Sequence, residues 1–379
     1  MERSDKMQII SYSPYCINYA GHYFPYYSTL ASICKKLGWG YTVFAAKNHT
    51  LNEDLKWEKW FSSSTKKKNS FYLRFLDYKA HHYTKIPNQR EIILLDSYTI
   101  TDLMAFCFAS ALAKTNRELI FFIRDDKFIS SFKKKDQVLA FIRKIIFSIS
   151  LSFLKRIYKN HVYFVTDSEI LRDVWSQKIS RQLHLLPIPH TTHLSDIKKT
   201  TDDRLIFWIP GNPDPLRGKN AAIAFSKLIA NSDAQLYISE EYQAWIPPSK
   251  NIHYLPSYIE EQKYAKLMKD SDYVLLFYHP FVFSSRTSGI FVEAIYAGNK
   301  VIVFEKSWAS YELRKYQLNE LIISPNEIKA ELIEKLKKFQ NCPNIKSKLK
   351  NIHTEYQKFH NINSFQNHFK ELLTRDTTY

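Results

Sequence analysis

Glycine is scarce in this sequence, with seven glycines among 379 residues, whereas a typical globular protein has about 7%. Glycine allows backbone conformations and close approaches that a side chain forbids. We therefore expect each remaining glycine to occupy a position of that kind. The glycines are Gly21, Gly38, Gly40, Gly211, Gly218, Gly289 and Gly298.

Cysteine pairs and long apolar runs are also absent. The four cysteines (Cys16, Cys34, Cys107 and Cys342) form no C-x-x-C pair, which is typical of free thiols in a reducing compartment. No uncharged apolar run reaches the roughly 18 residues of a membrane span, and the charged N-terminus does not resemble a signal peptide. We expect a cytoplasmic protein, at most associated with the inner face of the cytoplasmic membrane.

Positive charge is abundant and unevenly distributed. Lys and Arg number 54 against 37 Asp and Glu, and residues 1–200 carry a net charge of +14 compared with +3 for residues 201–379. The first half can therefore attract an anionic membrane or an anionic acceptor, although genome base composition can also enrich lysine. The aromatic residues are not interleaved with the basic ones and no nucleic-acid-binding motif is present, so we expect no nucleic-acid partner.

Short apolar runs alternate with segments of helical periodicity along the chain. Continuously apolar runs are typical of strands buried on both faces, so the pattern predicts an α/β protein with parallel sheets covered by helices. The predicted strands are Met7–Tyr12, Tyr41–Ala45, Ile92–Leu95, Leu119–Ile123, Val162–Val165, His184–Leu186, Arg204–Ile209, Gln235–Ile238, Ile252–Leu255, Tyr273–Phe277, Lys300–Phe304 and Leu321–Ile323.

Two domains, each with its own parallel sheet, account for this pattern. A strand ends at the prolines of Pro187–Pro189, and a polar run separates it from the next apolar strand. We expect an N-terminal domain over 1–195 and a C-terminal domain over 200–350. The remaining segment, 351–379, has no strand signal and is expected to form a helix that packs back on the N-terminal domain.

Three helix signals are clear. Ser257 with Glu260, and Ser324 with Glu327, have the spacing of capping boxes. Residues 136–159 have apolar side chains at helical spacing and are flanked by lysines and arginines, with nine basic residues and one acidic residue over 127–160. This basic helix either contacts an anionic membrane or is a core helix with a solvated face.

The stretch 278–303 has the strongest chemical signal. It reads as a strand, a polar loop, a helix and another strand, and the loop places hydroxyl residues and a glycine at the start of the helix. Free backbone N–H groups at a helix start favour a phosphate, and an arginine can add two hydrogen bonds. The candidate residues are Ser285, Arg286, Thr287, Ser288, Gly289 and, within the helix, Glu293. An ordinary helix cap with a surface glutamate is the alternative.

This stretch resembles the donor-binding signature of retaining glycosyltransferases of the GT-B fold (group 1 or family 4-like). The resemblance rests on Glu293-Ala294, Gly298 and the apolar strand Val301-Ile302. It implies two Rossmann-like domains that face each other across a cleft, and it gives Glu293 the nucleotide ribose to bind. The sequence departs from the signature at Ser285, where the family has its first Glu.

Two further loops are similar to parts of the same family. Gly211, Arg217 and Lys219 follow the first strand of the second half and resemble the loop that holds the donor diphosphate; a solvated turn is the alternative. Gly21 and His22 follow the first strand of the chain and resemble the glycine-rich loop of the acceptor domain. The resemblance allows His22 a contact with donor or acceptor, whereas a structural role is also open.

Acidic residues give weaker signals. Asp125 and Asp126 follow a predicted strand and therefore lie at the edge where parallel sheets bind ligands, so either could be a general base or an acceptor contact, or simply part of a loop. Asp96 ends another strand in the same way. Asp270 and Asp272 form a D-x-D, but they precede their strand, so we interpret them as a helix end.

The resemblance implies a glycosyltransferase that moves a sugar from a nucleotide-diphosphate sugar to a glycan or lipid-linked acceptor, with no metal and no further cofactor. The catalytic candidates are His22, Asp125, Arg217 and Lys219. Bacterial surface polysaccharide assembly is a plausible setting. A nucleotide-sugar epimerase of the same fold and a catalytically silent nucleotide-binding relative are the alternatives.

Overall fold

The computed structural model describes residues 7–18, 23–51, 56–62, 70–82, 89–113, 117–125, 134–191 and 204–374. The chain divides into two compact units. Unit 1 comprises Met1–Leu186 with Gln366–Tyr379, and unit 2 comprises Pro187–Phe365. The chain therefore passes from unit 1 to unit 2 at the prolines and returns to unit 1 for its last residues.

Unit 1 is built on a seven-stranded parallel sheet with the order β3-β2-β1-β4-β5-β6-β7. The central strands are almost entirely buried, which explains their continuously apolar sequences. The strands are β1 (Met7–Ser13), β2 (Gly40–Ala46), β3 (Trp57–Phe61), β4 (Arg90–Leu95), β5 (Glu118–Phe122), β6 (Val162–Thr166) and β7 (His184–Leu185).

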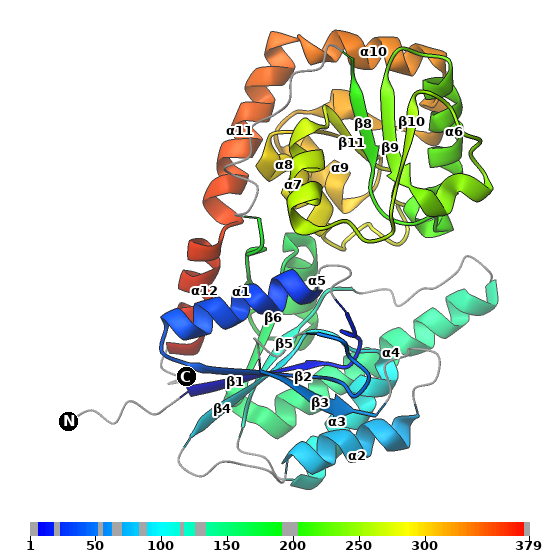
Figure 1. Cartoon of the computed structure of the whole chain (residues 1–379). Helices are drawn as coiled ribbons and strands as arrows, with labels where there is room; N and C mark the ends of the chain where they lie inside the picture. The colour runs from blue at the N-terminus through cyan, green and yellow to red at the C-terminus, as the bar shows by residue number, and fades with distance from the viewer. Residues whose placement is uncertain are drawn as a thin grey trace. The chain divides into compact units, whose positions relative to one another are not determined.

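The helices of unit 1 cover both faces of this sheet. The step from β1 to β2 runs in the opposite direction to the steps from β3 to β7, and because such crossovers are right-handed, α1 lies on the other face from α2, α3 and α4 (Figure 1). The helices are α1 (Tyr23–Lys36), α2 (Phe71–His82), α3 (Ile100–Ala113), α4 (Lys134–Tyr158) and α5 (Glu169–Ile179).

Unit 2 contains a six-stranded parallel sheet with the order β10-β9-β8-β11-β12-β13. The strands are β8 (Ile206–Ile209), β9 (Gln235–Ser239), β10 (Ile252–Leu255), β11 (Tyr273–Leu276), β12 (Lys300–Phe304) and β13 (Ile322–Ile323). The helices are α6 (Lys219–Ala230), α7 (Glu261–Asp270), α8 (Gly289–Ala297), α9 (Trp308–Lys315), α10 (Ala330–Gln340) and α11 (Pro343–Phe359). The helix α12 (Ile362–Thr374) ends the described chain.

The last helix supplies residues to unit 1. The Phe369 ring is buried with its centroid 6.2 Å from that of Trp39, and the Arg90 guanidinium donates to the Leu373 carbonyl at 3.0 Å. The segment expected as one helix over 351–379 is thus two helices, α11 and α12, and only the residues from Gln366 onward belong to unit 1.

One sequence expectation about a helix start is corrected, and another predicted helix is confirmed. The helix α7 begins at Glu261 without a side-chain cap, because Ser257 instead bonds the carboxylates of Glu240 and Glu241 on a neighbouring turn. The predicted helix over 136–159 is present as α4. The apolar stripe of this helix that the sequence shows faces outward, and a second set of apolar side chains packs on the sheet.

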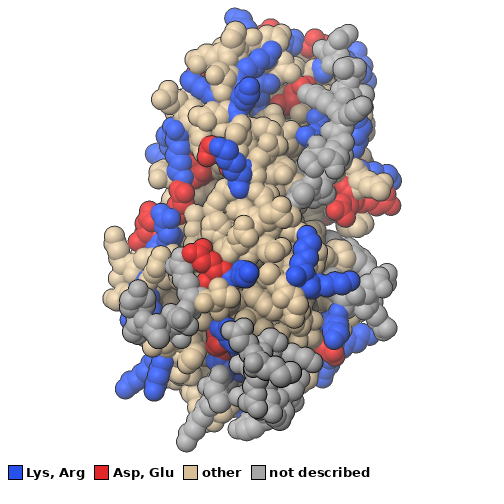
Figure 2. Space-filling view, turned by 90° about the vertical axis from the view of Figure 1, so that its left-hand side faces the viewer, with Lys and Arg blue, Asp and Glu red and all other residues tan. Residues whose placement is uncertain are grey.

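The face drawn in Figure 2 carries charges of both signs. In that view Lys and Arg side chains are interspersed with Asp and Glu and separated by uncharged surface. The surplus of positive charge therefore does not form one continuous basic field on this face.

Candidate functional site

The strand order of unit 2 fixes where a ligand can bind. In the sheet, β9 lies on one side of β8 and β11 lies on the other side. The loops that follow the neighbouring strands β8 and β11 therefore lead away in opposite directions. In open parallel sheets this switch point, at the carboxyl ends of the strands, is where ligands bind. The loops after β8 and β11, with the helices that follow them, contain all the donor-binding residues predicted in the second half of the sequence.

These two loops are joined by direct contacts. The His279 amide donates to the Leu216 carbonyl at 2.9 Å, which ties the end of β11 to the turn after β8. Gly218 has a φ of +85°, and a Cβ atom there would lie 2.2 Å from the Phe277 carbonyl oxygen. Only glycine fits this position, because both the left-handed conformation and the close approach exclude a side chain.

The turn after β8 leads directly into α6. Asp214 accepts from the Leu216 amide at 2.7 Å, and the short 3-10 turn Pro215–Arg217 ends at Gly218. Lys219 is the first residue of α6, and its ammonium lies 3.3 Å from the centroid of the exposed Trp245 ring. Arg217 is exposed beside it. Two cations therefore flank the N-terminus of a helix at the carboxyl edge of the sheet.

The loop after β11 ends at the N-terminus of α8. Ser288 caps the helix by accepting from the Phe291 amide at 3.2 Å, and its hydroxyl donates to the Tyr278 hydroxyl at 3.4 Å. Ser285 is buried in this loop, and Arg286 and Thr287 are half-buried. Because the first amides of a helix have no partner within it, α8 and α6 present two positive dipole ends at one edge.

Tyr278 links the predicted residues electrostatically. Burial raises the pKa of its hydroxyl, whereas the Ser288 hydrogen bond and the positive charges of Arg217 and Arg286 act in the opposite direction. The ring stacks on Phe283 with centroids 4.2 Å apart, and the Arg286 guanidinium lies 5.7 Å from the Phe283 ring centroid. Arg217 and Arg286 come from different loops, and the positive charges of both act on the Tyr278 hydroxyl.

Glu293 lies one turn into α8 and is buried, with 7% of its surface exposed. Tyr264 donates to one carboxylate oxygen at 2.5 Å, and His190 Nε2 lies 3.3 Å from the other. Burial, followed by the charge of Glu293, raises the pKa of Tyr264 well above its usual range. A carboxylate has about four acceptor sites, so two partners leave capacity for ligand hydroxyls.

His190 and Tyr264 are candidate site residues that the sequence did not single out. His190 directly follows the prolines of the domain boundary, and its ring lies near Gly289, where a Cβ atom would be 3.9 Å from Nε2. The neighbouring backbone is anchored to His360, because the Ile188 amide donates to His360 Nδ1 at 3.1 Å. No local spacing connects His190 with Glu293, so only the fold could pair them.

The carboxyl edge of the sheet in unit 1 carries an ion cluster. The Arg124 guanidinium lies 3.1 Å from the Asp167 carboxylate and 3.6 Å from that of Asp96, so it joins the ends of three adjacent strands. Burial raises the pKa of Asp96, and the Arg124 charge opposes this. Asp125 follows in the chain and is half-buried. The weaker candidate Asp96 is thus engaged by a cation, whereas the role of Asp125 stays a prediction.

Three predicted residues lie outside the described part of the chain: Gly21, His22 and Asp126. The predicted donor residues Gly211, Arg217, Lys219, Ser285, Arg286, Thr287, Ser288, Gly289 and Glu293 all belong to unit 2. The structure places these nine on the loops after β8 and β11 and the helices that follow them.

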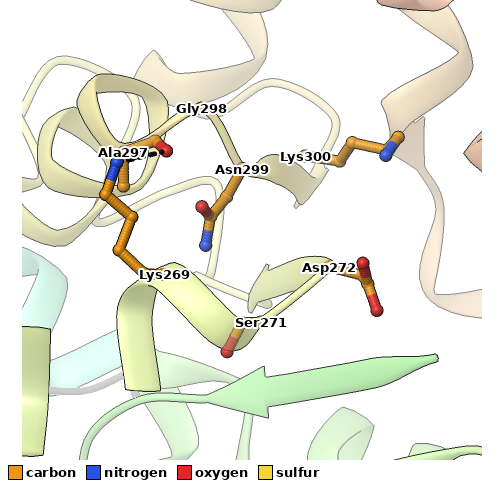
Figure 3. Close-up of a pocket in the computed structure, with 7 residues that line it drawn as sticks. All are labelled: Lys269, Ser271, Asp272, Ala297, Gly298, Asn299 and Lys300. Carbon is orange, nitrogen blue, oxygen red and sulfur yellow. Dashed lines mark hydrogen bonds between the residues drawn. The ribbon is translucent and has the colours of Figure 1, made fainter. Parts of the chain in front are cut away.

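A separate pocket of about 170 Å³ lies at the opposite, amino edge of the unit 2 sheet (Figure 3). It contains Asp272, which accepts from the Ile206 amide at 2.9 Å and from the Gln340 side chain at 2.7 Å. These bonds tie β8 and α10 to the start of β11. The D-x-D at this edge therefore has a structural explanation.

Comparisons with known proteins give the fold. No family model matches the sequence, and no curated protein matches it. Among solved structures, the chain is similar to a glycosyltransferase from Rickettsia africae ESF-5, with a TM-score of 0.68 and 12% identity over 98% of this chain and 100% of that chain. It is also similar to the glycosyltransferase SnogD from Streptomyces nogalater, with a TM-score of 0.55 and 12% identity over 97% and 99% of the two chains.

A UDP-N-acetylglucosamine 2-epimerase is similar as well, with a TM-score of 0.58 and 11% identity over 97% of this chain and 95% of that one. At such identities the similarity establishes the fold. The predicted fold class is confirmed: the chain has the GT-B fold, with two Rossmann-like units that each contain a parallel sheet.

Proposed function

We propose that this protein transfers a sugar from a nucleotide-diphosphate sugar to a glycan or lipid-linked acceptor. The observation that carries the proposal is the junction between the loops after β8 and β11, where the His279 amide bonds the Leu216 carbonyl. This junction brings the N-termini of α6 and α8 and the cations of both loops to the switch point of the sheet. An anion with two phosphates matches that arrangement.

The proposed chemistry uses these fixed charges. The bond between the sugar C1 and the diphosphate oxygen breaks, and its electron pair leaves with the nucleoside diphosphate. Arg217, Lys219 and the first turn of α8 stabilise the negative charge that develops there, so the proposal requires no metal. The acceptor oxygen bonds to C1 and loses its proton. His22 and Asp125 are the candidates to assist this step, and retention of configuration at C1 follows from the family resemblance alone.

Glu293 is proposed to bind the ribose hydroxyls of the donor. Its carboxylate is already oriented by Tyr264 and faces His190, so a ribose would complete an existing hydrogen-bond network. Preorganisation of this kind reduces the entropy lost on binding. Tyr264 and His190 then act as positioning residues for Glu293.

The experiment that tests the proposal is a thermal-shift panel of nucleoside diphosphates and their sugars. A ligand that binds only the folded state raises the melting temperature as its concentration exceeds Kd. Arg217→Ala with Lys219→Ala should abolish this shift, because both clamp cations are removed. Lys227→Ala with Lys250→Ala removes the same charge from exposed positions of unit 2 outside these loops and should leave the shift intact. A full shift in the clamp variant would refute the diphosphate assignment.

An epimerase is the second candidate, because an epimerase is among the structures of the same fold. It would convert the nucleotide sugar without any acceptor, whereas a transferase would release nucleoside diphosphate in proportion to the acceptor glycosylated. Incubating the protein with nucleotide sugar alone and following the sugar by NMR separates the two. Nucleotide binding without either product would indicate the silent relative, in which Ser285 replaces the family's first Glu.

For the cellular setting, we propose bacterial surface polysaccharide assembly at the inner face of the cytoplasmic membrane. A lipid-linked acceptor would be reached there, and the basic segment 136–159 is the part of the chain expected to contact the anionic surface. None of the described helices combines the length and apolarity that a bilayer crossing requires.

A further inference from the structure

The helix α4 is apolar on two opposite faces. One face packs on the sheet of unit 1 through Ala140, Phe147, Leu151, Leu154 and Tyr158. With 3.6 residues per turn, the other apolar stripe points about 180° away from it. That stripe is exposed and consists of Val138, Phe141, Ile142, Ile145, Ile149 and Phe153. A core helix with a solvated face would carry polar residues there.

The exposed apolar surface continues over the two preceding helices. On α2 and α3 the exposed apolar side chains are Phe71, Tyr72, Leu73, Leu76, Phe108 and Leu112. The rings of Phe71 and Phe108 meet edge to face with centroids 5.8 Å apart, so α2 and α3 share one surface. Together with Leu139 and the α4 stripe, these residues form what we call the three-helix face.

The concentration of these residues is unusual. Among the described residues, 17 large hydrophobic side chains are exposed, and 13 of them belong to the three-helix face. Single exposed apolar residues are normal on a protein surface, but a cluster of this kind marks an interaction site. The helices α2, α3 and α4 lie on the same side of the unit 1 sheet (Figure 1).

Basic residues close to these helices in the sequence indicate the occupant. In the sequence, one lysine triplet, Lys66–Lys68, ends two residues before α2, and another, Lys133–Lys135, spans the start of α4. With 3.6 residues per turn, the exposed Arg156 falls within the outward stripe of α4, whereas the half-buried Arg143 and Lys144 lie on the sides of the helix, nearer to the face that packs on the sheet. A second copy of the chain would bring these cations against each other. An anionic lipid surface instead complements them, with each basic residue near the surface contributing to attraction.

We infer that the three-helix face docks on an anionic bilayer, with its Phe, Leu and Ile side chains inserted at the boundary between headgroups and acyl chains. The basic residues then lie at headgroup level. This inference goes beyond contact through the basic helix alone, because it assigns the apolar side chains of three helices the principal role. It does not depend on the proposed transferase activity.

The test is co-sedimentation of the full chain with phosphatidylglycerol–phosphatidylcholine vesicles and with phosphatidylcholine vesicles. We expect binding to the anionic vesicles that weakens with salt. Phe141→Ser, Ile145→Ser and Ile149→Ser, combined, should reduce the partition coefficient about tenfold or more, because three exposed apolar side chains are lost. Circular dichroism and the melting temperature should stay near wild type, since none of the three is buried.

The matched control replaces exposed aromatic residues of unit 2, Tyr258→Ser and Tyr311→Ser, and should bind vesicles as the wild type does. Three outcomes would overturn the inference: wild-type protein that stays in the supernatant, equal binding by the triple variant, or equal loss in the control. Ultracentrifugation adds a fourth, namely a dimer that the triple variant dissociates, which would make the face a contact between copies.

Discussion

Gly218 shows how a single residue can hold two loops of the candidate site together. Its φ is positive, and a Cβ atom at this position would lie only 2.2 Å from the Phe277 carbonyl oxygen. A side chain therefore has no room there. Gly38 also has a positive φ, +72°, but a Cβ atom there would meet nothing within 4 Å. The two glycines therefore separate the effect of conformation from the effect of close packing.

We expect Gly218→Ala to destabilise the protein by more than the roughly 1–2 kcal/mol that a left-handed alanine costs, because the backbone must also move away from Phe277. Gly38→Ala should cost only that conformational amount. Urea unfolding of both variants measures the difference. Equal losses of stability would mean that the contact between the loops relaxes freely. The thermal shift caused by nucleotide should also disappear in Gly218→Ala, whereas Gly38→Ala should keep it.

Glu293 provides a second prediction at the residue scale. If its carboxylate binds ribose hydroxyls, Glu293→Gln should weaken nucleoside diphosphate binding by roughly tenfold to a hundredfold, the usual effect of losing charged hydrogen bonds. Binding of inorganic pyrophosphate should be unchanged, because pyrophosphate has no ribose. Calorimetry on both ligands is the measurement. A variant that loses both ligands equally would place Glu293 in the structural support of the loop.

At the scale of elements, β3 and α2 are the pieces that the sequence did not reveal. The strand β3 has the sequence Trp-Glu-Lys-Trp-Phe and lies at the edge of the sheet, so it lacks the continuous apolar run of the central strands. The helix α2 contains the buried Arg74, which pairs with Asp102 of α3 at 2.9 Å. A buried ion pair makes a core helix look polar in sequence, because its partner is distant in the chain.

The helix α12 supports a prediction at the same scale. Phe369 is buried against Trp39, so Phe369→Ala should lower the free energy of unfolding by about 3–5 kcal/mol. Lys370→Ala, the exposed neighbour, should have little effect. Urea unfolding again provides the measurement. If both variants unfold alike, the last helix is not a structural part of unit 1.

For the whole molecule, buried histidines predict how stability depends on pH. Burial, followed by the charge of Arg117, lowers the pKa of His81 to about 2 and that of His82 to about 3. Burial, followed by His190, lowers the pKa of His360 to about 3. In the unfolded chain these groups bind protons below about pH 6.5, whereas in the folded chain they stay neutral. Stability should therefore fall as the pH decreases below 6.5.

Each such histidine contributes up to about 1.4 kcal/mol per pH unit in this range. His82→Gln should therefore reduce the slope of the unfolding free energy against pH by about 1.4 kcal/mol per pH unit between pH 6 and 4. Urea unfolding at several pH values measures the slope. An unchanged slope would mean that His82 is protonated in the folded protein.

The sequence by itself determined the features that depend on neighbouring residues, whereas contacts between residues distant in the chain depended on the tertiary structure. Apolar runs determined the parallel strands, because a strand buried on both faces must be apolar whatever its neighbours are. The hydroxyl-rich loop of 284–289 likewise marked a helix start by local chemistry alone, and phosphate binding at this helix start stays a prediction. These signals sufficed for the α/β class, and the family resemblance they support implied the GT-B fold.

Only the tertiary structure decided which distant residues meet and which face of each helix is covered. His190 reaches Glu293 across 103 positions of sequence because the return of the chain to β11 places α8 beside the start of unit 2. The outward stripe of α4 could equally have been core in sequence, because apolar spacing records that a face is apolar and not what lies against it. Burial is a property of the packed elements, so no local pattern determines it.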